Sequence, residues 1–276
     1  MGTAAARWTE LVSNRHRPGG GPGRGGPGRM AENLREAGRR DMTRTPVFEA
    51  VVAGLGPERT VLDIGAGPGR YTLPLARAGC RVWALEPGEQ MRQFLKEDAA
   101  ALPAEASGRI TVVAATWPEA RDTVPVVEVA LASLVIHFCP DAAGFLAAME
   151  AAATRRCVLA IRVGQMQPLV AALWPRFHPE RPLPGQPVLA DLLGVMEEAG
   201  IHPDVHRHEA VRAYGRYASR DEARSQLAAA LHLEDDADLA RLDTELGPLL
   251  VPAEGGWRAA EPMHEAVVSW TPRRTA

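Results

Sequence analysis

The chain has 276 residues, of which 46% are hydrophobic and 24% are charged, and its formal net charge is −3 at pH 7. This length and apolar content suit one α/β domain with insertions and leave too little chain for two full domains. A slightly acidic chain has no overall positive field to recruit nucleic acid. We also find no apolar run of about 18 residues, which a membrane-spanning helix would need. The cysteines are Cys80, Cys139 and Cys157, and they have no paired spacing. We therefore expect neither a disulfide framework nor a zinc site. Free thiols of this kind favour a cytoplasmic location.

The first thirty residues divide into an amphipathic segment and a segment with the composition of a linker. Residues 4–14 predict a short helix. Its larger apolar residues fall on one side: Trp8, Leu11 and Val12. Residues 17–29 consist almost entirely of glycine, proline and arginine, which is typical of a flexible linker, with RNA contact as the alternative interpretation. We therefore expect a helix and flexible linker over residues 1–29 and a folded domain over residues 30–276.

From residue 45 onward, short apolar strands alternate with helical segments. The expected strands lie at about residues 60–64, 81–86, 110–114, 126–133 and 156–163. The expected helices cover residues 46–55, 71–78, 89–101 and 141–153. Regular alternation of this kind is the pattern of right-handed crossovers in a parallel sheet, so we predict a doubly wound α/β fold.

The pattern changes after the fifth expected strand. Residues 165–187 are rich in proline, and a helix over residues 188–199 follows them. The later segments predict a sixth strand at 203–211, helices at 219–231 and 235–250, and a last strand at 262–271. We expect the segments at about 164–187 and 219–250 to be insertions on the side of the domain where a substrate binds.

One strand runs directly into a glycine turn: Asp63, Ile64, Gly65, Ala66, Gly67, Pro68, Gly69 and Arg70. Three glycines without Cβ atoms let the main chain turn sharply and lie against a bound molecule, while a helix starts behind it near Tyr71. The nicotinamide and flavin fingerprint would need a third glycine where this chain has Arg70, which disfavours a dinucleotide. Asp63 would repel a pyrophosphate but suits a cationic amine, such as the amine of S-adenosylmethionine (SAM).

A second strand ends in an acid, Glu86, about twenty residues beyond the turn, where a carboxylate can accept both hydroxyls of a ribose. These residues resemble the class I SAM-dependent methyltransferases, with the glycine turn as the first motif, Glu86 as the second and residues 86–91 as the acid-plus-turn segment. Residues 117–119, 126–138 and 174–182 are similar to an actinobacterial subgroup that acts on small molecules. The resemblance implies a mostly parallel, seven-stranded Rossmann-like sheet with SAM as cofactor and S-adenosylhomocysteine (SAH) as product.

The resemblance also implies a cofactor site at the carboxyl ends of the strands. Asp63 would bind the amine directly or through water, with capping of the following turn as the alternative, and backbone near Ser133 would complete the clamp on the methionine part. We find no acid directly after the third strand, where the family often places one for the adenine amino group. Thr116 or a backbone carbonyl would serve there, with Trp117 or Met91 against the adenine, and a core role is the alternative for Trp117. The full expected set is Asp63, Gly65, Ala66, Gly67, Gly69, Tyr71, Glu86, Pro87, Met91, Thr116, Trp117 and Ser133.

Histidines supply the candidates for the chemistry. His137, four residues past Ser133, is the expected catalytic base, because neutral imidazole can take a proton from a hydroxyl or ammonium group at cellular pH. The alternatives are a structural histidine and a reaction that needs alignment alone. His178, between two arginines, lines the substrate mouth or belongs to a solvated loop. Three histidines lie close together at positions 202, 206 and 208, but they lack the acid or cysteine spacing of a metal site.

The sequence thus predicts a methyltransferase that acts on an oxygen or nitrogen of a small molecule by in-line displacement. An RNA methyltransferase is an alternative that would call for a basic nucleic-acid domain or an Asn-Pro-Pro-Tyr-like motif, and residues 133–138 do not supply that motif. A non-catalytic SAM-binding protein is the alternative from another class, because cofactor motifs say nothing of an acceptor. The acceptor and the oligomeric state, a homodimer included, stay open.

Overall fold

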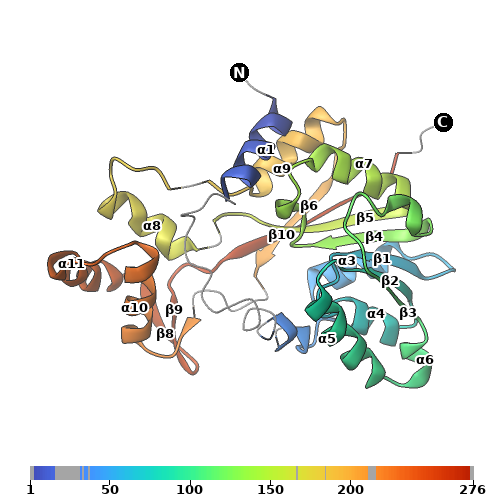
Figure 1. The fold of residues 1–276 in the computed structure, drawn as a ribbon, viewed down its shortest axis with the longest axis horizontal. Coiled ribbons are helices and arrows are strands. Elements are labelled where there is room, and N and C mark those ends of the chain that lie inside the picture. The colour runs from blue at the N-terminus through green and yellow to red at the C-terminus, as the bar shows by residue number, and fades with distance from the viewer. Residues whose placement is uncertain are drawn as a thin grey trace.

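The computed structural model describes residues 3–15, 34–36, 38–165, 167–183, 185–210 and 216–273, together with Glu32. The linker expected over residues 17–29 lies outside the described residues. A seven-stranded sheet with helices on both faces forms the larger part of the molecule, and a smaller lobe carries a three-stranded sheet of its own (Figure 1).

The main sheet has the strand order β3-β2-β1-β4-β5-β10-β6. Its strands are β1 (Thr60–Ile64), β2 (Arg81–Leu85), β3 (Ile110–Val113), β4 (Val127–Ser133), β5 (Ala153–Arg162), β6 (Asp204–Glu209) and β10 (His264–Trp270). Strands β1 to β5 pair in parallel, whereas β10 is antiparallel to both of its neighbours. The order reverses between β1 and β4, which opens a crevice at the carboxyl ends of the strands. The predicted doubly wound, mostly parallel fold is confirmed.

Helices cover both faces of this sheet, which explains why the central strands β1 and β4 are buried along nearly their whole length. The first face carries α1 (Ala4–Arg15), α7 (Ala142–Ala152) and α9 (Leu189–Glu198), and the second carries α3 (Pro46–Gly54), α4 (Thr72–Arg77) and α5 (Glu89–Ala100) (Figure 1). The short helix α6 (Ala104–Ser107) and the 3-10 turns η1 (Arg121–Thr123) and η2 (Ile136–Phe138) lie in connections.

Side-chain caps explain where several of the helices begin. Thr45 accepts a hydrogen bond from the backbone N–H of Phe48 and precedes Pro46, whose fixed φ suits the first helical position. Asp141 caps α7 in the same way, through the N–H of Gly144. These residue types are N-cap signals in the sequence, so the predicted starts of α3 and α7 are within one residue of the observed ones.

The smaller lobe combines the two segments that we expected to be separate insertions. It contains α8 (Pro168–Phe177), α10 (Arg220–Ala230), α11 (Asp236–Leu246) and the sheet of β7 (Arg216–Tyr217), β9 (Gly256–Ala259) and β8 (Leu250–Ala253). One hydrophobic core joins these elements. The lobe lies at the carboxyl edge of the main sheet, because the chain enters it from β5 and β6 and returns from β9 into β10 (Figure 1).

Two details of the lobe differ from the sequence prediction. The proline-rich segment contains a helix, because Pro168 stands at its first turn, where the missing N–H costs nothing, and only Pro175 lies inside it. The helix expected to reach residue 250 ends at Leu246, because strand β8 begins at Leu250 and pairs with β9. No described helix has the length and apolar character that crossing a membrane requires.

Candidate functional site

The glycine turn after β1 lies against the end of β2. The N–H groups of Gly65 and Ala66 both donate to the carbonyl oxygen of Leu85, at 2.8 and 3.0 Å. Gly65 has a φ of +68° and leaves no room for a side chain, since a Cβ there would lie 2.4 Å from Cγ1 of Val135. Gly67 has a φ of +56°, and a Cβ there would meet no atom within 4 Å. The turn is therefore closed on its inner side and open at Gly67, where a ligand can approach the backbone.

Glu86 fastens this turn to the one that follows β2. Its side chain is buried, and one carboxylate oxygen accepts from the N–H of Gly67 at 2.9 Å while the other accepts from the N–H of Gly88 at 2.7 Å. Each carboxylate oxygen can accept a second hydrogen bond, so Glu86 keeps acceptor capacity for a ligand hydroxyl.

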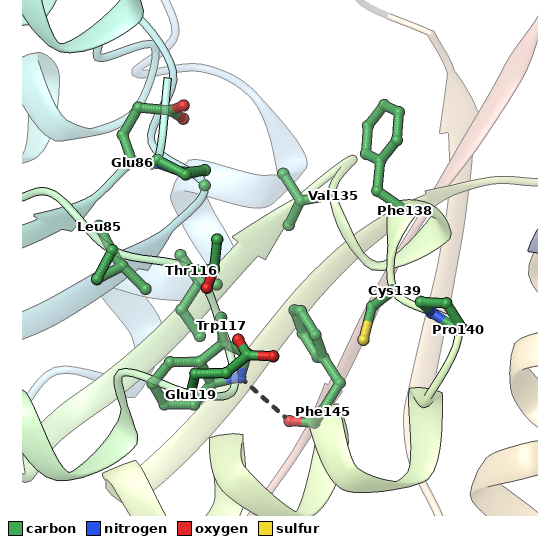
Figure 2. A pocket seen from close by; sticks show the side chains of 14 residues that line it. Leu85, Glu86, Thr116, Trp117, Glu119, Val135, Phe138, Cys139, Pro140 and Phe145 are labelled. Carbon is green, nitrogen blue, oxygen red and sulfur yellow. Dashed lines mark hydrogen bonds between the residues drawn. The ribbon is translucent and has the colours of Figure 1, made fainter. Parts of the chain in front are cut away.

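A cavity of about 450 Å³ opens beside the turn on the face that carries α7. It is lined by Ile64, Gly65, Leu85, Glu86, Pro87, Ala115, Thr116, Trp117, Glu119, Val135, Phe138, Cys139, Pro140 and Phe145. Figure 2 shows Glu86, Leu85 and Thr116 on one side and Val135, Phe138 and Cys139 on the other, with Trp117, Glu119 and Phe145 at the lower end of the view. A mainly apolar wall with a few carboxylates is typical of a small-molecule site of this size.

The cavity wall contains five of the twelve residues in the predicted cofactor set: Gly65, Glu86, Pro87, Thr116 and Trp117. Ala66, Gly67 and Gly69 belong to the adjoining turn, and Met91 packs beside Gly88 at the start of α5. Asp63, Tyr71 and Ser133 are not part of this wall. In β1 and β4, Asp63 and Ser133 share the pleat side of the core residues Val61 and Val129, and Tyr71 lies in that same core, on the face that carries α3 and α4.

Asp63 is buried in the protein interior. Its carboxylate accepts a hydrogen bond of 2.6 Å from the hydroxyl of Thr72, the first residue of α4, and 2% of the residue is exposed. Burial raises the pKa of Asp63 to about 6, against the opposing effect of the Thr72 hydroxyl and with a further upward contribution from the charge of Glu86. Both the predicted contact with the amine of SAM and its alternative, capping of the following turn, stay predictions.

Tyr71 packs in the core beneath α3 and α4. Burial raises the pKa of its hydroxyl, against the effect of Arg70 and of a hydrogen bond with Thr45. The guanidinium of Arg70 lies 5.4 Å from the centre of the Tyr71 ring. The ring that follows the glycine turn thus anchors the turn to the sheet from the side opposite the cavity.

Trp117 belongs to the hydrophobic core and to the cavity wall at once. Its indole N–H donates to the carbonyl oxygen of Phe145 at 3.3 Å, and the two rings meet edge to face with centroids 6.4 Å apart. Glu119, two residues further on, also lines the cavity, although no acid stands directly after β3. Glu119 follows Trp117 and Pro118 in the sequence, six residues beyond the end of β3, so its distance from the strand end does not predict a place in the cavity wall.

His137, the expected base, is buried within the short turn η2. Its ring lies against that of Phe138, with centroids 4.3 Å apart, and its neighbours Val135 and Phe138 line the cavity while His137 does not. A catalytic role for His137 stays a prediction. His178 has a partner inside the lobe, since its Nε2 lies 2.6 Å from the carbonyl oxygen of Leu231.

Helix α1 supports the cavity from behind. Trp8 is completely buried, and its indole N–H donates to the carbonyl oxygen of Cys139 at 2.9 Å. The hydroxyl of Thr9 donates to the carbonyl oxygen of Pro140 at 2.9 Å. Cys139 and Pro140 line the cavity, so the first helix of the chain holds one wall of the site although it lies about 130 residues away in the sequence.

The described residues contain no group of three or more histidine, cysteine or acidic side chains that could hold a metal ion. The rings of His206 and His208 stack at 6.2 Å in β6, an edge strand of the main sheet.

Comparisons with known proteins agree with this geometry. Residues 61–155 match the family model described as "Methyltransferase domain". A Haemophilus influenzae protein described as "Uncharacterized protein" is 31% identical over 105 residues, which cover 38% of this chain and 37% of that protein. The chain thus spans well under half of that relative's length.

Two solved structures share the fold. The magnesium protoporphyrin IX methyltransferase of Synechocystis, solved with bound SAH, has a TM-score of 0.50 at 16% identity, over 75% of this chain and 88% of that one. The YcgJ protein of Bacillus subtilis has a TM-score of 0.50 at 14% identity, over 83% of this chain and 98% of that one. Residues 61–155 thus match a methyltransferase domain, and the strand order of the main sheet is that of the Rossmann-like methyltransferase fold.

Proposed function

We propose that the protein transfers the methyl group of SAM to an oxygen or nitrogen atom of a small-molecule acceptor and releases SAH. The observation that carries the proposal is the pairing of an open glycine turn with Glu86 at the rim of one cavity. Both belong to the matched methyltransferase domain; the glycine turn follows β1, where the strand order reverses, and Glu86 follows the neighbouring strand β2.

The residues around the cavity fit SAM. Space beyond Gly67 leaves room for the methionine part along the backbone, and Glu86 has acceptor capacity for the ribose hydroxyls. Glu119 and Thr116 supply acceptors for the adenine amino group, next to the ring of Trp117. When bound, SAM supplies an electrophilic methyl group on a sulfonium, and the protein contributes alignment of the acceptor with that methyl group.

The lobe favours a small acceptor over RNA. It stands over the carboxyl edge of the sheet, where it can enclose an acceptor next to the cofactor. Two of its arginines already pair with acids of the same lobe, Arg176 with Glu245 and Arg224 with Asp243. Two arginines paired in this way contribute less to a basic surface of the kind that RNA binding needs.

A turnover assay tests the proposal against both alternatives. Purified protein is incubated with SAM and either pooled small phenols, alcohols and amines or total transfer RNA, and SAH is quantified by mass spectrometry. SAH formed only with the small molecules is the expected result. SAH formed only with RNA would favour the RNA alternative, and SAM binding without SAH in any pool would favour the non-catalytic one.

A further inference from the structure

The cavity beside the glycine turn has a buried floor and one large exposed residue at its rim. Trp117 and Phe145 are 8% and 3% exposed and form the floor, at the lower end of Figure 2. Phe138 lines the same cavity but is 50% exposed, and Figure 2 shows its ring on the side opposite Glu86, pointing away from the floor. The other exposed large hydrophobic residues of the described part do not line this cavity: Val52, Val126 and Val205.

The turn η2 holds Phe138 in place, so its exposure is not that of a loose loop. The N–H groups of Phe138 and Cys139 donate to carbonyl oxygens of the same turn at 3.0 and 2.9 Å. The buried ring of His137 packs against the ring of Phe138 with centroids 4.3 Å apart. From the other direction, Trp8 of α1 donates to the carbonyl oxygen of Cys139. The fold thus positions an aromatic ring at the opening of the cavity.

The wall around Phe138 consists of uncharged side chains: Val135, Cys139 and Pro140. The thiol of Cys139 already donates to the carbonyl oxygen of Asp141 at 3.4 Å. The two carboxylates of the cavity belong to the opposite side and to the floor (Figure 2). A charged or strongly polar group placed against this wall would lose its water without gaining a partner, whereas an apolar ring would bury apolar surface.

This wall also lies apart from the residues expected to hold the cofactor. None of the twelve expected cofactor residues belongs to it, and Glu86 and Thr116 stand across the cavity from it (Figure 2). Because the floor is closed, a methyl acceptor has to reach the cofactor over the open rim. Phe138 stands on that rim, where an incoming acceptor would cover its exposed half.

We propose that Phe138 determines the specificity for the acceptor, by packing its ring against an aromatic ring of that molecule. This inference rests on the proposed function and narrows the acceptor to a class: molecules whose hydroxyl or amine is attached to an aromatic ring or stands next to one. Two rings in offset-stacked or edge-to-face contact gain more than the burial of their area alone. Phe138 selects and orients the acceptor, and His137 positions Phe138 through the contact of their rings.

Binding of matched probes tests the acceptor class without turnover. Full-length protein saturated with SAH is titrated by calorimetry with 2-naphthol and with decahydro-2-naphthol, which keeps the hydroxyl and loses the aromatic rings. The wild type should bind 2-naphthol about fivefold more tightly than its saturated counterpart. Phe138→Leu keeps an apolar side chain and should lose this preference. Equal affinities in the wild type, or no binding of either probe to the SAH complex, would overturn the aromatic class.

Truncation of the ring separates contact with the acceptor from contact with the cofactor. For any aromatic acceptor that the wild type methylates, Phe138→Ala should raise the acceptor KM at least tenfold and leave the KM for SAM and the SAH affinity within twofold. The matched control is Phe94→Ala, which removes a partly exposed ring of α5 outside the cavity and should leave both KM values unchanged. Thermal unfolding of both variants verifies that they fold.

The outcomes distinguish this inference from the proposed function. Weakened SAH binding in Phe138→Ala would place the ring against the cofactor, and an unchanged acceptor KM would show that it does not contact the acceptor. Either result would overturn the inference. Turnover with aliphatic acceptors alone would overturn it too, while the proposed function would stand. No SAH binding by the wild type would overturn the proposed function and this inference together.

Discussion

The buried carboxylates at the two edges of the main sheet differ in what they do. At the amino edge, Glu128 accepts from the backbone N–H groups of Gly56, Glu58 and Thr60 at 3.0 to 3.3 Å. Burial acts to raise its pKa, but these N–H groups bring the pKa of Glu128 below the ordinary value. At the carboxyl edge, burial holds the pKa of Asp63 at about 6, and Glu265 has an oxygen without a donor.

This difference shows which buried carboxylates stabilise the folded domain and which lower its free energy of unfolding. At the amino edge a carboxylate binds the loop that enters β1, and at the carboxyl edge Asp63 and Glu265 are buried at a free-energy cost. Regions that violate the usual rules of burial are expected to be functional ones.

The largest expected effect comes from Asp63→Asn. Since the folded pKa of Asp63 is raised from 3.8 to about 6, the folded state holds its proton more tightly, so the stabilising contribution is present below pH 4 and is lost as the pH rises through 6. The asparagine keeps an acceptor for Thr72 and removes the buried charge, so it should gain about 3 kcal/mol of unfolding free energy at pH 8 and almost none near pH 4. Urea denaturation between pH 4 and pH 8 measures this gain, and equal stability at pH 8 would contradict the account.

Cofactor affinity of the same variant separates the two interpretations of Asp63. If the carboxylate faces the amine of SAM, directly or through water, Asp63→Asn should bind SAH more than tenfold more weakly despite its higher stability. Retained affinity in calorimetry would leave Asp63 with the capping role alone.

Glu128→Ala should show the opposite behaviour at the other edge. The substitution leaves several backbone N–H groups of the loop before β1 without their acceptor, and we expect a loss of about 2 kcal/mol in unfolding free energy. SAH affinity should not change, because the residue is remote from the cavity. Weakened SAH binding in a folded Glu128→Ala protein would show that the two edges are not independent.

Glu86→Ala should weaken SAH binding more than tenfold with little effect on folding, because Glu86 bonds only turn residues and faces the cavity. Calorimetric titration gives the affinity, and circular dichroism verifies the fold. Glu97→Ala, on the exposed side of α5, is the matched control and should bind SAH as the wild type does. Equal affinities of the two variants would remove Glu86 from the site.

The smallest expected effect is that of Trp8→Phe. The phenylalanine keeps most of the packing of α1 but loses the indole bond to Cys139, which should cost about 1 kcal/mol of stability and weaken SAH binding by roughly threefold. Thermal unfolding and calorimetry measure the two effects. Stability loss with unchanged SAH affinity would show that α1 supports the fold without shaping the cavity.

The sequence predicted best the features whose residues lie close together in the chain. Strand β1, the glycine turn and Glu86 lie within one short segment, and their spacing alone predicted a cofactor site. The role of Glu119 depends on a turn that brings it back beside Trp117, which strand-end spacing does not encode. The second sheet of the lobe arises from pairing between distant segments, and no periodicity within one segment carries that information. The place of His137 just beyond β4 predicts a catalytic base, whereas exposure to the cavity depends on the direction of each side chain in η2.

Titration of the full-length protein with SAM, SAH and NAD by calorimetry tests the central claim most directly. We expect micromolar binding of SAM and SAH, none of NAD, and loss of SAH binding in Glu86→Ala. Binding of NAD, or of no ligand, would contradict the assignment of the glycine turn and Glu86 to a SAM site.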